Sequence, residues 1–314
     1  MKYAIKKIIT MLFTLLLISF LVFLAFNVIP GDPATAKLGT QATPEKVEAL
    51  RHQMGLDRPF FVRYFEWLGG AVTFQFGTSY SYNMSVIQLI GSKLPVTLML
   101  AFLSFIMMTV IAIPVGIYAA KHEGSKIDRF ITVVNQGIMA IPPFFSGILI
   151  TLLFGLILRF FKPGGYVGFD KSFWGCLYYL LFPAFAIALP KAAMTIKLLR
   201  SSLLSEAKKD YVRTAYSRGN STTAVLYNHV LKNSMISVTT FLAMTLTDMI
   251  AGSVIMEQVF SVPGIGRILI TSISGRDYPV VMAIILLLAF LVILVNLISD
   301  IVCHILDPRI RQEV

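Results

Sequence analysis

Long apolar runs alternate with short polar segments along most of the chain. The apolar runs that are long enough to cross a bilayer occupy residues 8–28, 96–120, 130–160, 173–196, 236–259 and 280–305. A transmembrane α-helix needs roughly 20 consecutive, mostly apolar residues to span the hydrocarbon core. The pattern therefore predicts an all-α polytopic membrane protein with six transmembrane helices.

The first apolar run follows three lysines, as in a signal peptide, but it is longer than the apolar core of a typical signal peptide. It ends in Asn27-Val-Ile-Pro30, without the small residues of a cleavage site. We therefore expect residues 1–29 to form a first transmembrane helix with a cytoplasmic N-terminus. Residues 30–95 are then an extracytoplasmic segment, and residues 96–314 form a transmembrane domain of five helices.

Two adjacent prolines, Pro142 and Pro143, stand in the middle of the third run. Proline removes a backbone donor and kinks a helix. Membrane helices tolerate this where neighbouring groups satisfy the freed carbonyl oxygens. We expect a kinked third span, in which the two prolines shape a vestibule between helices.

The distribution of lysine and arginine predicts the orientation, because cytoplasmic loops carry an excess of both residues. The segments expected inside contain Lys2, Lys6, Lys7, Lys121, Lys126, Arg129, Lys197, Arg200, Lys208, Lys209, Arg213, Arg218, Lys232, Arg309 and Arg311. The short turns expected outside contain Arg159, Lys162, Lys171, Arg267 and Arg276. This bias places both termini in the cytoplasm.

Composition supports a membrane protein and excludes several other classes. The chain is 56% hydrophobic and 14% charged, with a mean hydropathy of +0.77. Its net charge of +11 does not indicate nucleic-acid binding, because the basic residues lie in short segments between apolar runs. Cys176 and Cys303 lie near the ends of apolar runs and indicate neither a disulfide framework nor a metal cluster.

The sequence lacks the common motifs of nucleotide binding and hydrolysis. It contains no G-x-x-x-x-G-K-[ST], H-E-x-x-H or G-x-S-x-G motif, and its four histidines are scattered. A membrane enzyme is therefore not expected, whereas a channel or a secondary carrier stays an alternative at this point. Asp248 is the clear ionisable residue inside a span, and Glu257 lies nearer the outer end of the same span. Asp248 is either a functional residue or a buried polar group bonded to a neighbouring helix.

Residues 200–237 form a long polar segment with a dense positive charge between two apolar runs. Leu203, Leu204, Ala207, Tyr211 and Ala215 recur at helical spacing, which predicts one amphipathic helix. Gly219 is expected to end this helix, and Ser221 to cap a second, short helix. Two short helices that meet at a glycine would form an exposed knob.

This knob resembles the Glu-Ala-Ala motif in the membrane subunits of ABC importers. The matching pattern is Arg213-Thr-Ala215, then Gly219 four residues on, then His229-Val-Leu231. Arg213 and Thr214 replace Glu and Ala, and Lys232 stands where proline is common, as in the peptide and nickel branch. The resemblance implies that the loop at about 200–235 contacts an ATPase. The residues it implies for this coupling are Asp210, Tyr211, Arg213, Thr214, Ala215, Arg218, Gly219, His229 and Leu231.

Further matches cover nearly the whole chain and resemble the first permease subunit of dipeptide, oligopeptide and nickel importers. They are Pro30-Gly-Asp-Pro33, Met54-Gly-Leu-Asp-Arg-Pro59, Phe76-Gly-Thr-Ser79, Leu94-Pro-Val-Thr-Leu98, Glu257-Gln-Val-Phe-Ser-Val-Pro-Gly-Ile-Gly266, Arg276-Asp-Tyr-Pro279 and Leu306-Asp-Pro-Arg309. The resemblance implies a type I importer fold in a bacterial cytoplasmic membrane. It also implies a second permease, two cytoplasmic ATPases and an external binding protein as partners.

The same resemblance implies that this chain binds no cofactor and that its partner ATPases use ATP and Mg²⁺. Import of di- and oligopeptides is the expected function, and import of nickel or a nickel chelate is the alternative. Asp248, Pro142, Pro143 and Glu257 are the residues expected along the translocation path.

Overall fold

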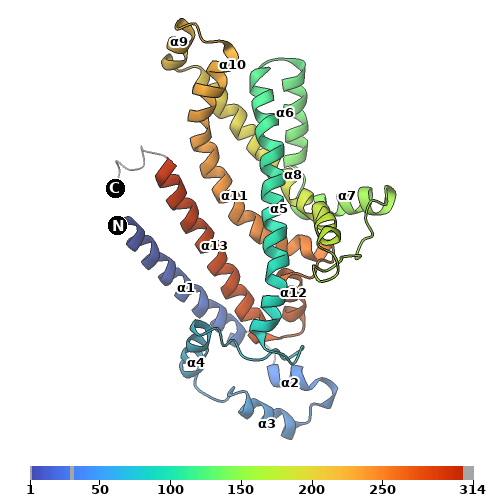
Figure 1. Cartoon of the computed structure of the whole chain (residues 1–314). Coiled ribbons are helices and arrows are strands. Elements are labelled where there is room, and N and C mark those ends of the chain that lie inside the picture. The colour runs from blue at the N-terminus through green and yellow to red at the C-terminus, as the bar shows by residue number, and fades with distance from the viewer. Residues whose placement is uncertain (1, 29–31, 307–314) are drawn as a thin grey trace. The chain divides into compact units, whose positions relative to one another are not determined.

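The computed structural model describes residues 2–28 and 32–306 (Figure 1). In that part of the chain all regular elements are helical, apart from one isolated bridge between Thr78 and Ser85. The α-helices are α1 (Lys2–Val28), α2 (Pro33–Leu38), α3 (Pro44–Gln53), α4 (Phe60–Val72), α5 (Val86–Lys121), α6 (Lys126–Met139), α7 (Pro143–Ile150), α8 (Phe173–Ala207), α9 (Asp210–Ser217), α10 (Thr222–Val225), α11 (Leu231–Val259), α12 (Ile265–Ser274) and α13 (Tyr278–Leu306). The short elements η1 (Gly39–Gln41), η2 (Thr151–Ile157) and η3 (Leu226–Val230) are one 3₁₀ and two π-helical turns.

The predicted all-α membrane fold is confirmed. Among the described residues, five helices are long and apolar enough to cross a membrane, or six if α6 and α7 with η2 count as one span. The five lie at 6–28, 86–121, 173–207, 222–259 and 278–301. The motif at residues 30–33 lies partly outside the described residues. The tail motif at residues 306–309 also lies partly outside them. The side chain of Cys303 and the C-terminus lie outside them entirely.

The third span is broken rather than kinked, which corrects the sequence-based expectation. α6 and the α7–η2 pair meet at 102°. Pro142 has φ −59° and ψ 141°, an extended conformation. A residue that precedes a proline is pushed out of the α region, and Pro143 begins a new helix where its missing N–H costs nothing. The proline pair therefore ends one helix and starts another.

Other predicted boundaries also move. α5 begins at Val86, ten residues before the predicted start, because Val86, Leu89 and Ile90 are buried, although polar residues such as Gln88 and Ser92 interrupt the apolar run here. The predicted amphipathic helix across residues 203–215 is divided. α8 ends at Ala207, and α9 starts at Asp210 after the extended residue Lys209.

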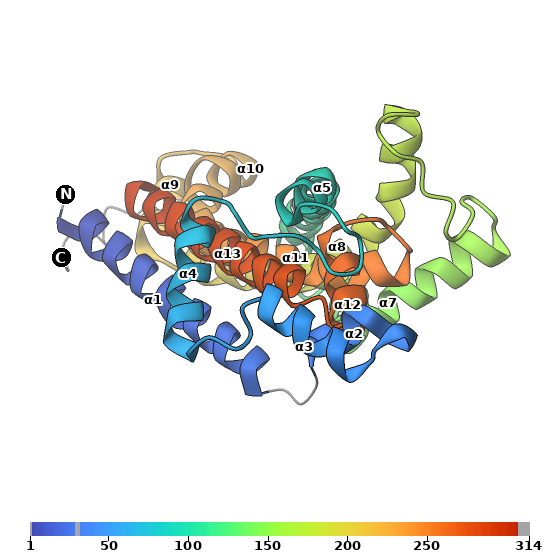
Figure 2. The ribbon, with the colours of Figure 1, turned by 90° about the horizontal axis from the view of Figure 1, so that it is seen from below.

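The chain forms two compact units. The first comprises Met1–Thr97 with Pro263–Leu294, and the second comprises Leu98–Val262 with Val295–Val314. In the first unit α4 lies across α1, and α3 lies beside α2 (Figure 2). One apolar cluster joins the start of α5 to α12 and α13. A second joins Phe23 and Tyr64 to Tyr278 and Met282.

Asp277 connects distant parts of the first unit. Its carboxylate is fully buried. It accepts hydrogen bonds from the Ser79 hydroxyl and from the backbone N–H groups of Tyr80 and Ser81. A buried carboxylate needs several such donors. The loop before α5 is thereby fixed to the start of α13.

The second unit is built around α8, which packs against α6, α7 and α11. Pro183 and Pro190 lie inside α8 without ending it. The N–H that Pro190 lacks would donate to the carbonyl oxygen of Ala186. The Ser146 hydroxyl of α7 lies 3.0 Å from that oxygen and 2.6 Å from the Pro143 oxygen, so it can satisfy the freed acceptor.

Candidate translocation and coupling sites

A charged pair lies between two apolar helices of the second unit. The Lys191 Nζ of α8 is 2.7 Å from the Asp248 Oδ2 of α11. The Lys191 side chain is 24% exposed and that of Asp248 is 61% exposed. Charges inside membrane-spanning segments are costly, face the bundle interior or a water-filled cavity, and pair with one another. The sequence indicated Asp248 but not its partner Lys191, although a lysine inside the fourth apolar run was a usable signal.

Asp248 belongs to an exposed stripe along α11, called here the α11 stripe. Its members recur every three or four residues, which places them on one face of the helix: Ser237, Thr240, Met244, Asp248, Ala251, Ile255 and Gln258. Beside it, the Thr247 hydroxyl donates to the Asn296 side-chain oxygen of α13, 2.9 Å away. The exposed face of α1 is by contrast largely isoleucine, leucine and phenylalanine. Four of the seven members of the α11 stripe are polar or charged, so it suits water and polar groups better than the face of α1 does.

The other residues expected along a path, Glu257, Pro142 and Pro143, lie outside the α11 stripe. Glu257 is fully buried near the end of α11 and is not part of the α11 stripe. Pro142 and Pro143 are exposed at the break between α6 and α7. In the described part of the chain no group of three or more His, Cys, Asp or Glu is arranged to hold a metal ion.

The predicted knob is present, but its second helix is not short. Gly219 has φ +83° and separates α9 from α10, and α10 continues through η3 into α11 as one apolar helix over residues 222–259. The Ser221 side chain accepts from the Ala224 N–H, as predicted. A Cβ at Gly219 would meet nothing within 4 Å in this chain, so the backbone conformation, and not a close approach inside the chain, requires glycine here.

α9 has a buried face and an exposed face. Val212 and Ala215 are buried, and Tyr211 is half-buried with its hydroxyl donating to Glu206 Oε1, 2.9 Å away. The residues on the exposed face and in the following turn are Asp210, Arg213, Thr214, Tyr216, Ser217, Arg218, Gly219 and Asn220. Ala215 and Val212 thus anchor the helix. The polar residues stay accessible to a partner, although Arg213 lies 3.7 Å from Asp210 within the same helix. Sequence reasoning missed Val212 and Ser217.

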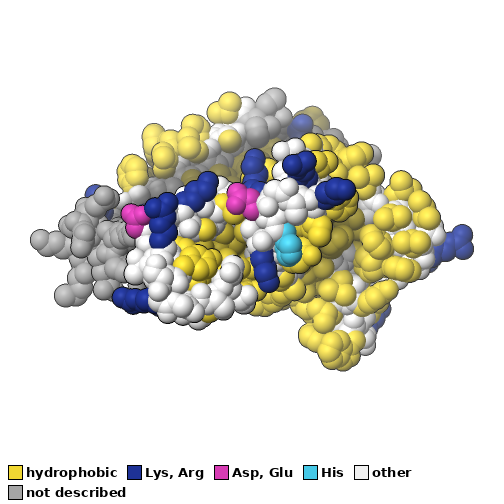
Figure 3. Space-filling view, turned by 90° about the horizontal axis from the view of Figure 1, so that it is seen from above, with side chains coloured by type: hydrophobic (Ala, Val, Ile, Leu, Met, Phe, Trp, Pro, Cys, Tyr) yellow, Lys and Arg dark blue, Asp and Glu magenta, His cyan; other side chains and the backbone are white. Residues whose placement is uncertain are grey.

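Two further expected coupling residues lie after α10. His229 is exposed on η3, and Leu231 is half-buried at the first position of α11. Figure 3 looks onto the end of the molecule where Figure 1 places α9 and α10, and shows many Lys and Arg side chains with fewer acidic ones. This end can therefore receive a partner with acidic groups.

An ion pair that the sequence did not reveal braces the helices before the knob. Arg200 of α8 donates from Nε and Nη2 to the two carboxylate oxygens of Asp128, each 2.6 Å away. The Asp128 side chain is 4% exposed and also accepts from the Gly124 N–H. A bidentate Arg–carboxylate pair is strong and fixed in direction. It connects the start of α6 to the last turns of α8.

Comparisons with known proteins agree with this architecture. Residues 112–312 match the model of the binding-protein-dependent transport system inner membrane component. Residues 1–101 match the model of the N-terminal part of such membrane components. A crystal structure of an amino acid ABC transporter with histidines is similar in fold, with a TM-score of 0.50 and 16% identity over 69% of this chain and 94% of that chain.

Curated relatives match over almost their whole length. A putative peptide transport system permease protein of Brucella abortus (strain 2308) is 36% identical over 308 residues, 98% of each chain. The oligopeptide transport system permease protein AppB of Bacillus subtilis (strain 168) is 36% identical over 98% of this chain and 99% of its own. The dipeptide transport system permease protein DppB of Lactococcus lactis subsp. cremoris (strain MG1363) is 32% identical over 99% of each chain.

The fold and the exposed polar helix face define a multi-span membrane permease. The chain belongs to the family of inner membrane components of binding-protein-dependent transport systems. It is a transport subunit of the bacterial inner membrane.

Proposed function

We propose that this chain is one of two permease subunits of an ATP-driven importer of di- and oligopeptides. Its relatives in Brucella, Bacillus and Lactococcus are named as peptide permeases, which favours peptide as the cargo. None of these three is named as a nickel permease, so the nickel alternative is not carried forward. An external binding protein delivers the peptide, and the chain itself binds no cofactor.

The α11 stripe, with the Lys191–Asp248 pair, is the observation that carries this proposal. A peptide has charged ends and a polar backbone, so its path must offer polar groups and water instead of lipid. The α11 stripe offers both hydroxyl and charged groups within a span. We assign it to the translocation path, facing the second permease. The proline break at Pro142 and Pro143 gives the path its wider end.

The knob around Gly219 is the proposed contact with the ATPases. Two cytoplasmic ATPases bind ATP and Mg²⁺, and their closure moves α9 and α10. The rigid Asp128–Arg200 brace carries this motion into α6 and α8, since packed helices shift as bodies. In this arrangement both termini and the knob lie in the cytoplasm, as the lysine and arginine distribution predicts.

Uptake measurements test the proposed cargo. Cells that lack this chain are given labelled di- and tripeptides, with and without depletion of ATP, and are complemented with the wild-type chain. We expect complementation to restore ATP-dependent peptide uptake, and radioactive nickel uptake to be the same in all strains. Loss of nickel uptake with unchanged peptide uptake would refute the assignment.

A further inference from the structure

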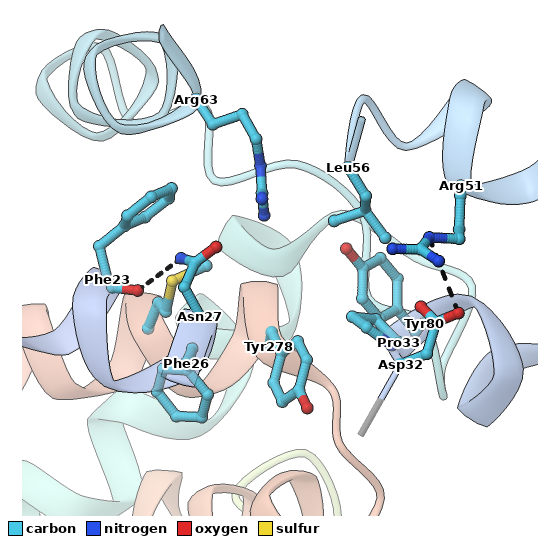
Figure 4. Close-up of a pocket in the computed structure, with 11 residues that line it drawn as sticks. Phe23, Phe26, Asn27, Asp32, Pro33, Arg51, Leu56, Arg63, Tyr80 and Tyr278 are labelled. Carbon is cyan, nitrogen blue, oxygen red and sulfur yellow. Dashed lines mark hydrogen bonds and ion pairs between the residues drawn. The ribbon is translucent and has the colours of Figure 1, made fainter. Parts of the chain in front are cut away.

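The first unit contains a small cavity that the transport cycle does not explain. Its volume is about 260 Å³, and it is lined by residues of α1, α2, α3, α4 and the start of α13 (Figure 4). Pockets for drug-sized ligands span roughly 300–1,000 Å³. The cavity is therefore suited to a small chemical group and not to a peptide.

Arg63 is the central cation of this cavity. Its side chain extends from α4 into the space between Asn27 and Tyr80 (Figure 4). It lies 5.8 Å from the ring centre of Phe23. No carboxylate among the described residues forms an ion pair with it. Burial lowers the pKa of Arg63, and the nearby charge of Asp57 offsets only part of this effect, because desolvation disfavours the charged form of a half-buried cation.

The neighbouring arginines differ from Arg63 in this respect. Arg51, which also lines the cavity, lies 3.9 Å from the Asp32 carboxylate, the acidic group in the lining. Arg58 lies outside the cavity lining and pairs with Glu66 at 2.7 Å. The lining contains two arginines, Arg51 and Arg63, and one carboxylate, Asp32. Since Asp32 lies next to Arg51, the excess positive charge of the lining is at Arg63.

A neutral donor, Tyr80, and a second cation, Lys37, lie on the same side of the cavity as Arg63. Burial, together with the nearby Asp277, raises the pKa of Tyr80 to about 12, so its hydroxyl keeps its proton and can donate. Lys37 lies 5.4 Å from the centre of the Tyr80 ring. Tyr278 also lines the cavity, but its buried hydroxyl points away from Arg63 (Figure 4), so Tyr80 is the neutral donor on the Arg63 side. These groups suit an anion with several acceptor oxygens.

The position along α1 indicates which anion is available. Asn27 is one residue before the end of the 27-residue helix α1. A helix of that length measures about 40 Å, longer than the hydrocarbon core of about 30 Å. The end of α1 therefore lies at the level of lipid headgroups. Aromatic residues gather there, among them Phe20, Phe60 and Trp67, as is typical of a membrane interface.

We propose that this cavity binds the phosphate of a phospholipid headgroup, with Arg63 as the main charged contact and the Tyr80 hydroxyl as a neutral donor. The acyl chains would lie along the exposed apolar face of α1, where Leu17, Leu21 and Leu24 are exposed. The bound lipid would hold α1 and α4 together. This proposal stands independently of the cargo that the transporter carries.

Native mass spectrometry of the full-length chain, purified with its associated subunits, tests this site. The probes are phosphatidylglycerol, diacylglycerol, which lacks the phosphate, and millimolar inorganic phosphate. We expect the wild-type protein to retain phosphatidylglycerol and not diacylglycerol. Retention should fall about fivefold in Arg63→Gln, since one basic residue contributes about 1 kcal/mol to binding an anionic lipid. Arg63→Lys should keep part of it.

Arg58→Gln is the matched control, because it removes an arginine from the same segment outside the cavity lining, and it should retain lipid as the wild type does. Equal retention by wild type and Arg63→Gln would overturn the proposal. So would displacement of phosphatidylglycerol by inorganic phosphate, which would identify a site for the free ion. Gel filtration of each variant separates lipid loss from misassembly, and Arg63→Lys restores the charge if Arg63→Gln fails to assemble.

Discussion

The Ser146 hydroxyl of α7 lies 3.0 Å from the carbonyl oxygen of Ala186 in α8, the acceptor that Pro190 leaves without its helical donor. A proline inside a membrane helix is tolerated where a neighbouring side chain satisfies the freed carbonyl. The broken third span and the continuous fourth span are thus connected at the proline that would otherwise weaken α8.

Ser146→Ala should lower the stability of the purified protein by about 1 kcal/mol, because the Ala186 oxygen loses its donor in an apolar interior. Pro190→Ala restores the N–H of residue 190, so Ser146→Ala should cost much less in that background. Thermal unfolding of the two single variants and the double variant measures this. Equal costs of Ser146→Ala in both backgrounds would show that the hydroxyl does not serve Ala186.

Asp248→Asn and Lys191→Gln should each reduce peptide uptake by about tenfold or more, equivalent to ~1.4 kcal/mol, because each leaves the other charge unpaired in a span. The exchange Lys191→Asp with Asp248→Lys re-forms the pair and should recover part of the uptake. Uptake is compared at equal membrane abundance. Wild-type uptake by both single variants would remove the pair from the translocation path.

Gly219→Ala should uncouple ATP hydrolysis from transport while the protein still assembles. A non-glycine residue with left-handed backbone costs about 1–2 kcal/mol, and φ at Gly219 is +83°. Gly137→Ala is the control, since Gly137 is inside α6 with open space around its Cβ position. We expect the control to behave as wild type. The role in coupling fails if peptide-stimulated ATP hydrolysis and uptake are normal in Gly219→Ala.

Arg200→Gln should destabilise the protein by about 2–4 kcal/mol, because it leaves the buried Asp128 carboxylate without its main partner. Arg200→Lys should recover only part of this loss, since an ammonium group cannot bind both carboxylate oxygens in the fork geometry. Thermal unfolding of the purified variants checks both values. A loss well below 1 kcal/mol in Arg200→Gln would mean that Asp128 finds other donors.

Hydropathy was sufficient to predict the fold class and the approximate positions of the spans, because lipid requires long apolar helices whatever their packing. Boundaries that depend on packing were not predictable. Val86 starts α5 among polar neighbours because α12 and α13 cover its apolar residues. The break at Pro142 was predicted as a kink, since proline spacing alone does not give the angle between two helices.

The candidate site residues also fall into two groups, those that the local sequence predicts and those that depend on helix packing. Gly219 and Ser221 act locally, through φ and a cap, and could be predicted from neighbouring residues. Lys191 and Asp248 are 57 residues apart in sequence, and Arg200 and Asp128 are 72 apart. Pairs of this kind form only when helices pack, so single-sequence periodicity does not reveal them. The cavity around Arg63 likewise needs residues from α1, α4 and α13 together.

The most direct test of the central claim is the reaction of single cysteines along α11 with a membrane-impermeant thiol reagent, after Cys176 and Cys303 are replaced by serine. Thr240→Cys and Ala251→Cys lie on the α11 stripe. The controls are Ser253→Cys, at a fully buried position of α11, and Leu16→Cys, on the exposed apolar face of α1.

Water is needed to form the reactive thiolate. We expect both stripe cysteines to react, more slowly when peptide is being transported, and both controls to stay unmodified. Unreactive stripe cysteines, or reaction rates that transported peptide does not change, would contradict a peptide path along α11.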